Sequence, residues 1–374
     1  MRLLIQHPHA AGEISGVLTS IQEMLAALSV HPELDVQVFS SKGRRLADQW
    51  RAVQWSDAVM LNSNALSMIL FGRISRKKTL LKLHYPQYQT VHKTYESMSF
   101  SKRIFVEIRH LVGLKSSASY ILMSLARLVL RTAAALTADR VCACSQFCAK
   151  QASLPRDVAV LKNPLSVTYG LPNRALDDLD RPFRFFFAGR ISDEKGWDTL
   201  LDAASLLRDR GHEFTVDLAG DGPEFDLLKA RVASSRMTEQ ISVLGRLSAT
   251  QVRERLAGAL AVVISSRVQE TAGYVALEAA AVQVAAIVSR VGGLPETAGA
   301  DCPSFEPGEA ETLMRHMESF LLDPPGCLDV GRKSYLRVQQ EFDPRFVAAQ
   351  LLQLLSRDDL VKTLELAARR DGQG

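Results

Sequence analysis

Short apolar runs alternate with amphipathic stretches along the chain, and this alternation occurs in two separate series. The first series has apolar runs at 2–6, 35–40, 58–63 and 79–85, with a helical pattern at 17–30. The second has runs at 183–190, 213–220, 240–246, 258–266, 285–290 and 302–307, with helical patterns at 196–210 and 223–233. Short apolar runs separated by helical segments are typical of parallel sheets covered by helices. The pattern therefore predicts an α/β protein with two doubly wound domains.

A stretch rich in Pro, Asp and Asn separates the two series. Residues 164–182 read PLSVTYGLPNRALDDLDRP, a composition that favours turns and connections. We therefore divide the chain into four parts: a Rossmann-like domain at 1–165, a linker at 166–182, a second Rossmann-like domain at 183–340, and a terminal helix with a tail at 341–374.

The composition is that of a soluble globular protein. Of the 374 residues, 47% are hydrophobic and 23% are charged, which is enough apolar material for substantial cores. The first sixteen residues have one basic side chain and only three consecutive strongly apolar ones, too few for a secretory signal. The most apolar long stretch, 119–138, contains Arg127 and Arg131. We therefore expect no membrane-spanning helix and a cytoplasmic protein.

The cysteines do not form the pattern of a metal site. Five are present, without an evident disulfide framework, and Cys142, Cys144 and Cys148 have no second cluster of Cys or His to complete a ligand set. We expect buried thiols in a reducing compartment and no bound metal.

Positive charge is concentrated in the N-terminal half. Residues 1–180 carry 22 Lys and Arg against 13 Asp and Glu, whereas 181–374 carry 23 against 28. Within 99–138, the basic residues Lys102, Arg103, Arg109, Lys115, Arg127 and Arg131 are interleaved with apolar ones and opposed by Glu107 alone. This tract is either a basic amphipathic surface for an anionic membrane or a set of helices that cover the rim of the sheet. No recognition motif or stacking platform for nucleic acid accompanies the charges.

Two loops of the second series place glycines and cations after predicted strands. In FAGRISDEKG, Arg190 follows a strand and Lys195 precedes a glycine and a helix. The two cations could grip a diphosphate or could be solvated surface charges. In LAGDGPEF, Gly220 and Gly222 form either an ordinary turn into a helix or a loop that lets the backbone approach a ligand.

A third loop combines two glutamates with the start of a helix. The stretch SRVQETAGYVALEAAA, 266–281, places Glu270 before a small-residue turn and Glu278 eight positions later. If Gly273 begins the helix, its N–H groups and dipole favour an anion. The two glutamates either accept hydroxyl groups from a sugar and a ribose, or are a helix N-terminal carboxylate and an exposed helix charge.

In their order and spacing, the motifs GRISDEKG, LAGDGPE, VLGRLS, SSRVQETAGYVALEA and VGGLPE resemble group 1, or family 4, retaining glycosyltransferases. This resemblance covers residues 184–297 and implies the GT-B fold, in which two Rossmann-like domains face a central cleft. It implies that Glu270 faces the donor sugar and Glu278 holds the ribose. It also implies donor-diphosphate contacts from Arg190 and Lys195. The other donor-binding residues that it implies are Gly16, Gly189, Gly220, Gly222, Arg246, Thr271, Ala272, Gly273 and Tyr274.

The resemblance is weaker in the N-terminal half. HPHAAGEISGV, which contains Gly16, is similar to the family's first glycine loop, and LLKLHY places His84 where the family often has a histidine near the transferred sugar. Without the resemblance, His84 is interpreted as a hydrogen-bonded loop histidine. The sequence departs from the family at Ala272, where an aromatic is common, and at Gln283 and Ala285, where Gly and Pro are common. These departures affect packing and bear on the identity of the donor.

The resemblance implies a metal-independent, retaining hexosyltransferase that needs no cofactor. Its catalytic residues would be Glu270, Arg190, Lys195 and His84, its donor a UDP- or GDP-sugar held by the C-terminal domain, and its acceptor a glycan or lipid-linked molecule held by the N-terminal domain. The implied pathway is bacterial polysaccharide or lipopolysaccharide synthesis. The protein would be cytoplasmic, or peripheral on the inner face of the cell membrane.

Two other classes were weighed against this interpretation. A Rossmann oxidoreductase requires a G-x-G-x-x-G fingerprint, which GEISG does not supply. A non-catalytic membrane-associated or assembly protein of glycosyltransferase descent is the alternative that the motifs leave open. In the GT-B fold a terminal helix commonly crosses back to the first domain, so we expect this of residues 342–355.

Overall fold

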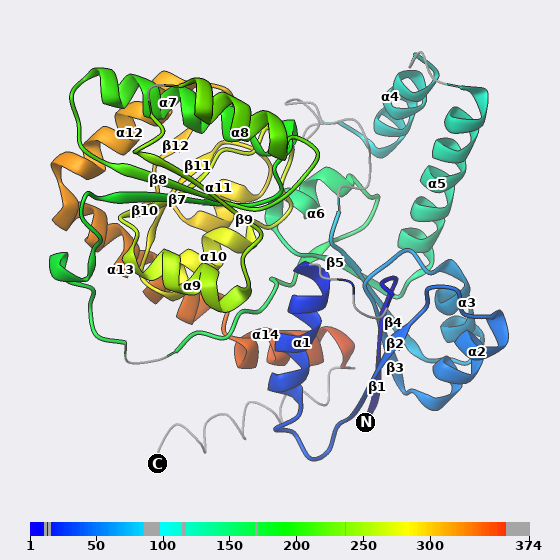
Figure 1. The fold of residues 1–374 in the computed structure, drawn as a ribbon. Coiled ribbons are helices and arrows are strands. Elements are labelled where there is room, and N and C mark those ends of the chain that lie inside the picture. Colours follow the sequence, from blue (N-terminus) through cyan, green and yellow to red (C-terminus); the bar gives the residue numbers. More distant parts are fainter. Residues whose placement is uncertain are drawn as a thin grey trace. The chain divides into compact units, whose positions relative to one another are not determined.

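The computed structural model describes residues 1–10, 13, 16–85, 98–113, 117–168, 171–235 and 237–356, which form two compact units (Figure 1). The first unit combines Met1–Pro164 with the chain from Phe342 onward, and the second consists of Leu165–Glu341. The first unit is therefore built from both ends of the sequence, whereas the second is continuous.

Six parallel strands form the sheet of the first unit, in the order β2-β1-β3-β4-β5-β6. They are Arg2–His7 (β1), Asp35–Ser40 (β2), Ala58–Leu61 (β3), Lys78–Leu83 (β4), Arg140–Ala143 (β5) and Ala159–Val160 (β6). The helices of this unit are Gly16–Leu28 (α1), Leu46–Trp55 (α2), Leu66–Ile74 (α3), Phe100–Gly113 (α4), Ala118–Thr137 (α5), Gln146–Ala152 (α6) and Pro344–Leu355 (α14).

Helices α1 and α14 share one core of the first unit. Ile21 of α1 and Leu351 of α14 pack in one buried cluster with Leu3, Ile5 and Met60 from the sheet. Apolar residues recur every three or four positions on both helices, so each presents one continuous apolar face to the strands. The last described helix of the chain thus completes the core that the first helix begins (Figure 1).

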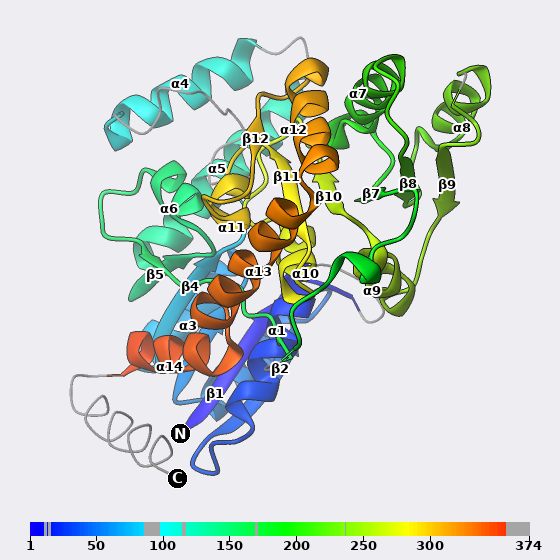
Figure 2. The same cartoon turned by 90° about the vertical axis from the view of Figure 1, so that its left-hand side faces the viewer.

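The sheet of the second unit also has six parallel strands, in the order β12-β11-β10-β7-β8-β9. They are Arg184–Ala188 (β7), Thr215–Ala219 (β8), Ile241–Gly245 (β9), Ala261–Ile264 (β10), Ala285–Ser289 (β11) and Ser304–Phe305 (β12). The helices are Trp197–Asp209 (α7), Phe225–Ser234 (α8), Ala249–Gly258 (α9), Tyr274–Ala281 (α10), Leu294–Ala298 (α11), Ala310–Leu322 (α12) and Pro324–Glu341 (α13). Figure 2 shows α12 and α13 running beside β11.

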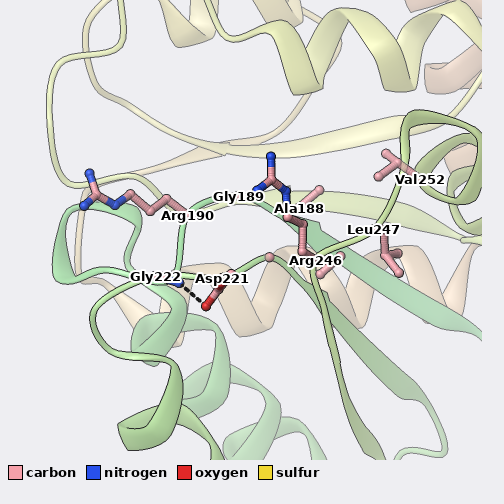
Figure 3. A pocket seen from close by; sticks show the side chains of 10 residues that line it. Ala188, Gly189, Arg190, Asp221, Gly222, Arg246, Leu247 and Val252 are labelled. Atoms are coloured by element: carbon pink, nitrogen blue, oxygen red, sulfur yellow. Dashed lines mark hydrogen bonds between the residues drawn. The ribbon is translucent and has the colours of Figure 1, made fainter. Parts of the chain in front are cut away.

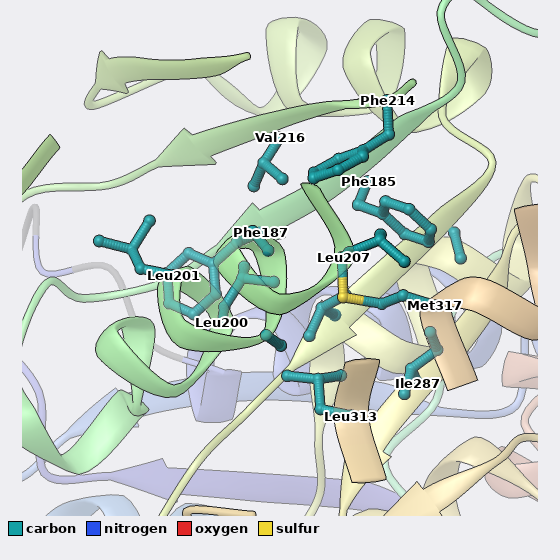
Figure 4. Close-up of a cluster of buried hydrophobic side chains, with 14 of the residues drawn as sticks. Phe185, Phe187, Leu200, Leu201, Leu207, Phe214, Val216, Ile287, Leu313 and Met317 are labelled. Atoms are coloured by element: carbon teal, nitrogen blue, oxygen red, sulfur yellow. The ribbon is translucent and has the colours of Figure 1, made fainter. Parts of the chain in front are cut away.

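Alternate side chains of β7 enter two different cores. Phe185 and Phe187 pack in one cluster with Leu207 of α7 and Met317 of α12 (Figure 4), whereas Phe186 packs on the other side with α9 and α10. Burial on both faces explains why this strand is a continuous apolar run in the sequence. The prediction of two doubly wound α/β domains is confirmed.

The segment predicted as a linker packs on the second unit. Arg174 donates hydrogen bonds to the carbonyl oxygens of Ala257 at 2.7 Å and Ala259 at 2.8 Å. The Tyr335 hydroxyl donates to the carbonyl oxygen of Thr168 at 2.6 Å. These contacts explain why the division between the two units lies at Pro164 and Leu165, at the beginning of the predicted linker.

Helix α5 differs from the expectation drawn from its charges. Among the residues that the structure describes, it is the one helix long and apolar enough to cross a membrane by length and composition. Arg127 and Arg131 were the reason to expect no membrane-spanning helix, but α5 meets the criteria of length and apolar composition with both arginines included. Within its most apolar window 22% is buried in the structure, so most of that window lies on the surface.

Candidate active site

The strand order of the second unit indicates where a ligand would bind. β7 and β10 are neighbours at the centre of the sheet although they are not consecutive in the chain. In doubly wound sheets, ligands bind beyond the carboxyl ends of the strands at such a switch point. The loops that follow β7 and β10 contain Lys195 and Glu270.

Lys195 and Glu270 are in direct contact at this switch point. The Lys195 ammonium donates a hydrogen bond to Glu270 Oε1, and the Ser266 hydroxyl donates to the same oxygen at 2.8 Å. The side chains of Lys195 and Glu270 are 29% and 21% exposed, so each keeps accessible surface for a ligand. The fold thus joins two predicted site residues that lie 75 positions apart in the sequence.

Backbone contacts hold the two loops together. Gly196 has a φ of +61°, and a Cβ atom built there would lie 2.2 Å from the Ser265 carbonyl oxygen. The Ser265 hydroxyl donates to the Lys195 carbonyl oxygen at 3.1 Å, and the Arg267 N–H donates to the Glu194 carbonyl oxygen at 2.8 Å. Because a side chain at position 196 would separate the loops, glycine is required there.

The side chain of Arg267 joins the same loops, although the sequence did not identify it as a site residue. Its guanidinium donates to Asp198 Oδ2 at 2.6 Å and to Thr199 Oγ1 at 3.1 Å, and it pairs with Asp193. Burial acts to lower the pKa of Arg267, but Asp198 and Asp193 raise it above its ordinary value. Arg267 lies within the motif SSRVQETAGYVALEA, but the motif did not indicate this role, because its partners lie 68 to 74 positions away.

The loop after β11 supports Glu270 from the backbone side. The Gly293 N–H donates to the Glu270 carbonyl oxygen at 2.6 Å. A Cβ atom on Gly292, whose φ is +59°, would lie 2.2 Å from that oxygen. The Ser289 hydroxyl donates to the Ser266 carbonyl oxygen at 2.6 Å. Three loops therefore fix the position of Glu270. Ser266, Ser289, Gly292 and Gly293, which make these contacts, were not among the predicted site residues.

A pocket of about 440 Å³ opens at the ends of β7, β8 and β9 (Figure 3). Its lining consists of Ala188, Gly189, Arg190, Ala219, Gly220, Asp221, Gly222, Arg246, Leu247 and Val252. Predicted donor-binding residues from three separate motifs are thus gathered on one cavity. Two cations and an apolar end give this pocket the features required for an anionic ligand with a flat ring.

Glycines bring the strand ends of the pocket into close contact. A Cβ atom on Gly220, whose φ is +144°, would lie 1.7 Å from the Gly189 carbonyl oxygen, and one on Gly222 would lie 2.3 Å from the Ile191 carbonyl oxygen. The carboxylate of Asp221 accepts a hydrogen bond from the Gly222 N–H at 2.7 Å, which makes Asp221 a turn residue. In Figure 3 the Arg190 and Arg246 side chains extend from different parts of the lining.

Helix α10 begins beyond Glu270, as the sequence predicted. Gly273 is its N-cap, and a Cβ atom there would lie 2.3 Å from Leu294 Cδ1. Thr271, Ala272 and Tyr274 around this N-terminus are all partly exposed. Glu278, further along the helix, is also partly exposed.

Glu278 has an unusual electrostatic environment for a helix carboxylate. Burial raises its pKa above the ordinary value, and Arg253 of α9 acts in the opposite direction. A carboxylate that is partly removed from water is stabilised by ligand hydroxyl groups that donate to it. This environment is not that of the exposed helix charge, which was one of the two interpretations of Glu278.

In the first unit, His84 lies just after β4 and is buried. Its Nε2 atom is 2.7 Å from Asn62 Oδ1, and burial, followed by the charge of Lys82, holds its pKa well below the ordinary value. His84 is thus the neutral histidine, hydrogen-bonded within its own unit, that residue-level reasoning predicted. Gly16 is the first residue of α1. The neighbouring positions 11, 12, 14 and 15 of the predicted glycine loop lie outside the described residues.

His84 also lines a small polar pocket of about 40 Å³ within the first unit. The other lining residues are Asn62, Ser63, Asn64, Lys82, Leu83, Tyr85 and Arg131. Burial lowers the pKa of the Arg131 guanidinium, and its neighbour Arg127 adds to this effect. The Asn64 Oδ1 atom is buried without a hydrogen-bond partner among the described residues. Hydroxyl or ammonium groups of a ligand could satisfy this oxygen.

The described part of the chain contains no group of three or more His, Cys, Asp or Glu side chains able to hold a metal ion. All five cysteines are buried free thiols. Burial raises the pKa of Cys142 to about 12, so this thiol remains protonated near neutral pH and is a poor metal ligand.

Residues 174–337 match the family model described as glycosyl transferases, group 1. This match confirms the resemblance carried by the motifs. A 2-deoxystreptamine glucosyltransferase of Streptomyces kanamyceticus is 34% identical over 44% of this chain and 43% of its own length. An alpha-D-kanosaminyltransferase of the same organism is 28% identical over 68% of this chain and 64% of its own length. The chain therefore spans less than two thirds of either relative.

Solved structures share the fold over nearly the whole chain. HepE of Anabaena, crystallised with UDP and glucose, has a TM-score of 0.69 at 17% identity and covers 95% of this chain and 99% of its own. A lipopolysaccharide outer core galactosyltransferase, WaaB, has a TM-score of 0.64 at 16% identity and covers 93% and 97% of the two chains. These similarities confirm the predicted GT-B fold.

Proposed function

We propose, from the premise that residues 174–337 match the family model of group 1 glycosyl transferases, that the protein transfers a sugar from a nucleotide-diphosphate-sugar to an acceptor. The observation that carries the proposal is the contact of Lys195 with Glu270 at the switch point between β7 and β10. The proposed reaction requires a cation beside the donor diphosphate and a carboxylate beside the sugar hydroxyl groups. Lys195 and Glu270 would supply these two groups side by side.

The proposed donor is a UDP- or GDP-sugar. The pocket beside Arg190 and Arg246 supports the nucleotide part of this proposal, because it combines two cations with the apolar Leu247 and Val252. Structures of the fold relative HepE contain UDP and UDP-glucose. The partly buried Glu278 is proposed to accept hydrogen bonds from the ribose.

The proposed chemistry follows from where charge develops. Glycosyl transfer passes through a positively charged, sugar-like transition state, while negative charge grows on the leaving diphosphate. Arg190, Lys195 and the N-terminus of α10 would stabilise that negative charge, and Glu270 would hold the sugar. The proposal includes retention at the anomeric carbon and independence from a metal ion.

His84 and Gly16 belong to the first unit, which we propose binds the acceptor. The acceptor is proposed to be a glycan or a lipid-linked glycan of bacterial polysaccharide or lipopolysaccharide synthesis, used in the cytoplasm or at the inner face of the cell membrane. The polar pocket beside His84, with Asn64 Oδ1 and Arg131, supports an acceptor rich in hydroxyl groups.

The first experiment is calorimetry and thermal-shift titration of the purified protein with UDP, GDP, ADP and their common sugars, with and without magnesium. We expect one nucleotide class to stabilise the protein equally in both conditions, and Arg190→Ala to weaken its binding. Arg315→Ala, on an exposed side chain of α12, is the matched control. If no nucleotide stabilises the protein, the non-catalytic alternative replaces the proposed function.

A further inference from the structure

Helices α4 and α5 of the first unit, called here the α4–α5 hairpin, carry a concentrated apolar surface. The exposed large apolar side chains on them are Phe105, Ile108, Val112, Tyr120, Leu122, Met123, Val129, Leu130 and Leu136. Leu122 is 70% exposed and Val129 is 66% exposed. Single exposed apolar residues are ordinary, but Ile108, Val129 and Leu136 of this set line one groove, and grouped exposed apolar residues mark an interaction surface.

An apolar groove lies within this surface. It has a volume of about 420 Å³ and is lined by Phe100, Ile104 and Ile108 of α4 and by Leu125, Leu128, Val129, Thr132, Ala133 and Leu136 of α5. Figure 1 shows the two helices standing next to each other at the edge of the first unit. With Thr132 as its one polar lining residue, the groove suits a hydrocarbon chain rather than a sugar or a nucleotide.

Charge distinguishes between the occupants that such a surface could have. Lys102, Arg109 and Arg127 are exposed on the same two helices, and the one acidic residue in α4 and α5, Glu107, is buried. Two copies of the hairpin facing each other would bring like charges together, which opposes self-association. Exposed basic residues beside an apolar face are instead the features of a helix that lies in the interface of an anionic bilayer.

Helix α5 connects this surface with the polar pocket of the first unit. Arg131 lines the pocket that contains His84 and Asn64, whereas the adjacent Thr132 and Ala133 line the apolar groove. A molecule with a polar head and a hydrocarbon tail could therefore contact both sides of one helix.

We propose that the α4–α5 hairpin binds the surface of an anionic bilayer and that its groove receives a lipid hydrocarbon chain. Apolar side chains enter the interface while Lys102, Arg109 and Arg127 contact anionic headgroups. The proposal also implies that the acceptor is a lipid-linked molecule presented at the membrane, and this implication rests on the proposed function. Binding of the hairpin to lipid does not itself depend on catalysis.

The test is co-sedimentation of the full chain with vesicles of phosphatidylglycerol or of phosphatidylcholine at low and high salt. We expect binding to phosphatidylglycerol that decreases with salt, and weaker binding to phosphatidylcholine. Val129→Glu and, separately, Leu122→Glu should each weaken binding by roughly tenfold or more, since each removes an apolar contact and adds a repelled charge. Ile74→Glu, which alters a side chain of α3 that is 71% exposed, is the control and should bind like the unaltered protein.

A second pair of variants tests the charge contribution. Lys102→Glu combined with Arg109→Glu should weaken binding to phosphatidylglycerol by roughly tenfold or more and leave phosphatidylcholine binding nearly unchanged. Arg44→Glu, at an exposed position of the same unit, should have little effect. The proposal is overturned if the unaltered protein binds neither vesicle, or if Val129→Glu and Leu122→Glu bind as it does.

Two further measurements separate the remaining explanations. If light scattering shows a dimer that Val129→Glu dissociates, and no vesicles are bound, the occupant of the surface is a second copy and the bilayer proposal is wrong. Nucleotide titration of Val129→Glu should match that of the unaltered protein, because the pocket lined by Arg190 lies in the second unit. If Val129→Glu loses vesicle binding but still binds nucleotide, the role of the hairpin in lipid binding is supported. If the unaltered protein binds no nucleotide, only the proposed transferase function is contradicted.

Discussion

The Lys195 ammonium donates a hydrogen bond to the carboxylate of Glu270, and the loops bearing them follow neighbouring strands at the centre of one sheet. The pair positions opposite charges where a diphosphate and a sugar would meet in the proposed reaction. In the proposed reaction, binding of the diphosphate would require Lys195 to share its hydrogen bonds between Glu270 and phosphate oxygens. The first two predictions separate the roles of these side chains.

Lys195→Ala is expected to lower the affinity for the nucleoside diphosphate by about 10- to 100-fold, because a hydrogen bond to a charged group contributes about 1.5–3 kcal/mol. Calorimetry with the nucleotide identified in the screen measures this change. Lys229→Ala, at an exposed position of α8, is the control. Equal nucleotide affinity in both variants would contradict the diphosphate role of Lys195.

Glu270→Gln is expected to lower the rate of sugar transfer by about 100-fold, the scale of losing one group that stabilises a transition state, with little effect on nucleotide affinity. The amide keeps the shape of the side chain but removes the negative charge facing the sugar. Transfer assays at saturating donor provide the measurement. Glu254→Gln, at an exposed position of α9, is the control. An unchanged transfer rate excludes Glu270 from the proposed mechanism.

Arg267→Ala is expected to loosen the loop that carries Lys195. Its loss leaves Asp198 and Thr199 without the donor they now share, at a cost of about 1–3 kcal/mol in unfolding free energy. Hydrogen exchange at 193–199 should accelerate, and the KM for the donor should rise. Arg267→Lys should restore the stability more fully than the donor KM, since an ammonium cannot reproduce the planar fork of arginine. A purely structural role would instead leave the donor KM unchanged once stability is restored.

Gly220→Ala is expected to destabilise the protein by at least about 2 kcal/mol more than Gly211→Ala, since it adds a steric clash to backbone strain. Both glycines have positive φ, but the Cβ atom at 220 would lie 1.7 Å from the Gly189 carbonyl oxygen and the one at 211 meets no atom within 4 Å. Urea unfolding of the two variants measures the difference. Similar losses would mean that backbone conformation alone, and not the close contact beside the pocket, requires glycine.

The pH dependence of stability should change in Glu278→Gln. Burial raises the pKa of Glu278 in the folded protein above its ordinary value of 4.5, so the folded state binds more protons than the unfolded state between the two pKa values. The contribution of Glu278 to the free energy of unfolding therefore falls as the pH rises through this range. Relative to the unaltered protein, Glu278→Gln should gain stability in urea unfolding as the pH rises above 4.5. Glu254→Gln serves as the exposed control, and parallel pH profiles for all three proteins would contradict the assignment.

Strand β11 could be predicted because its side chains are buried on both faces, so that Ala285–Ser289 is apolar up to its last residue and lies within the predicted run 285–290. Strand β2, Asp35–Ser40, has the bounds of the predicted run although none of its residues is fully buried, because polar and apolar residues alternate in DVQVFS. The bounds of α7 and α10 were close to the predictions because Gly196 and Gly273 mark their N-termini. Local chemistry was sufficient for these elements.

The parts that could not be predicted depend on contacts between distant segments. Arg267 lies in a motif that predicted the role of Glu270 only, and its own role follows from partners after a different strand. The predicted linker belongs to the second unit because Arg174 donates hydrogen bonds to carbonyl oxygens more than 80 positions away. The pairing of Lys195 with Glu270 likewise depends on a residue 75 positions away.

The placement of α14 has a consequence for the order in which the protein is made. Val347, Ala348 and Leu351 complete the core that contains Val17 and Ile21, so the first unit cannot close until the ribosome has synthesised α14. The continuous second unit, Leu165–Glu341, is synthesised entirely within that interval. The N-terminal unit, although translated first, is the last to acquire a complete core and waits with an open apolar face that chaperones can bind.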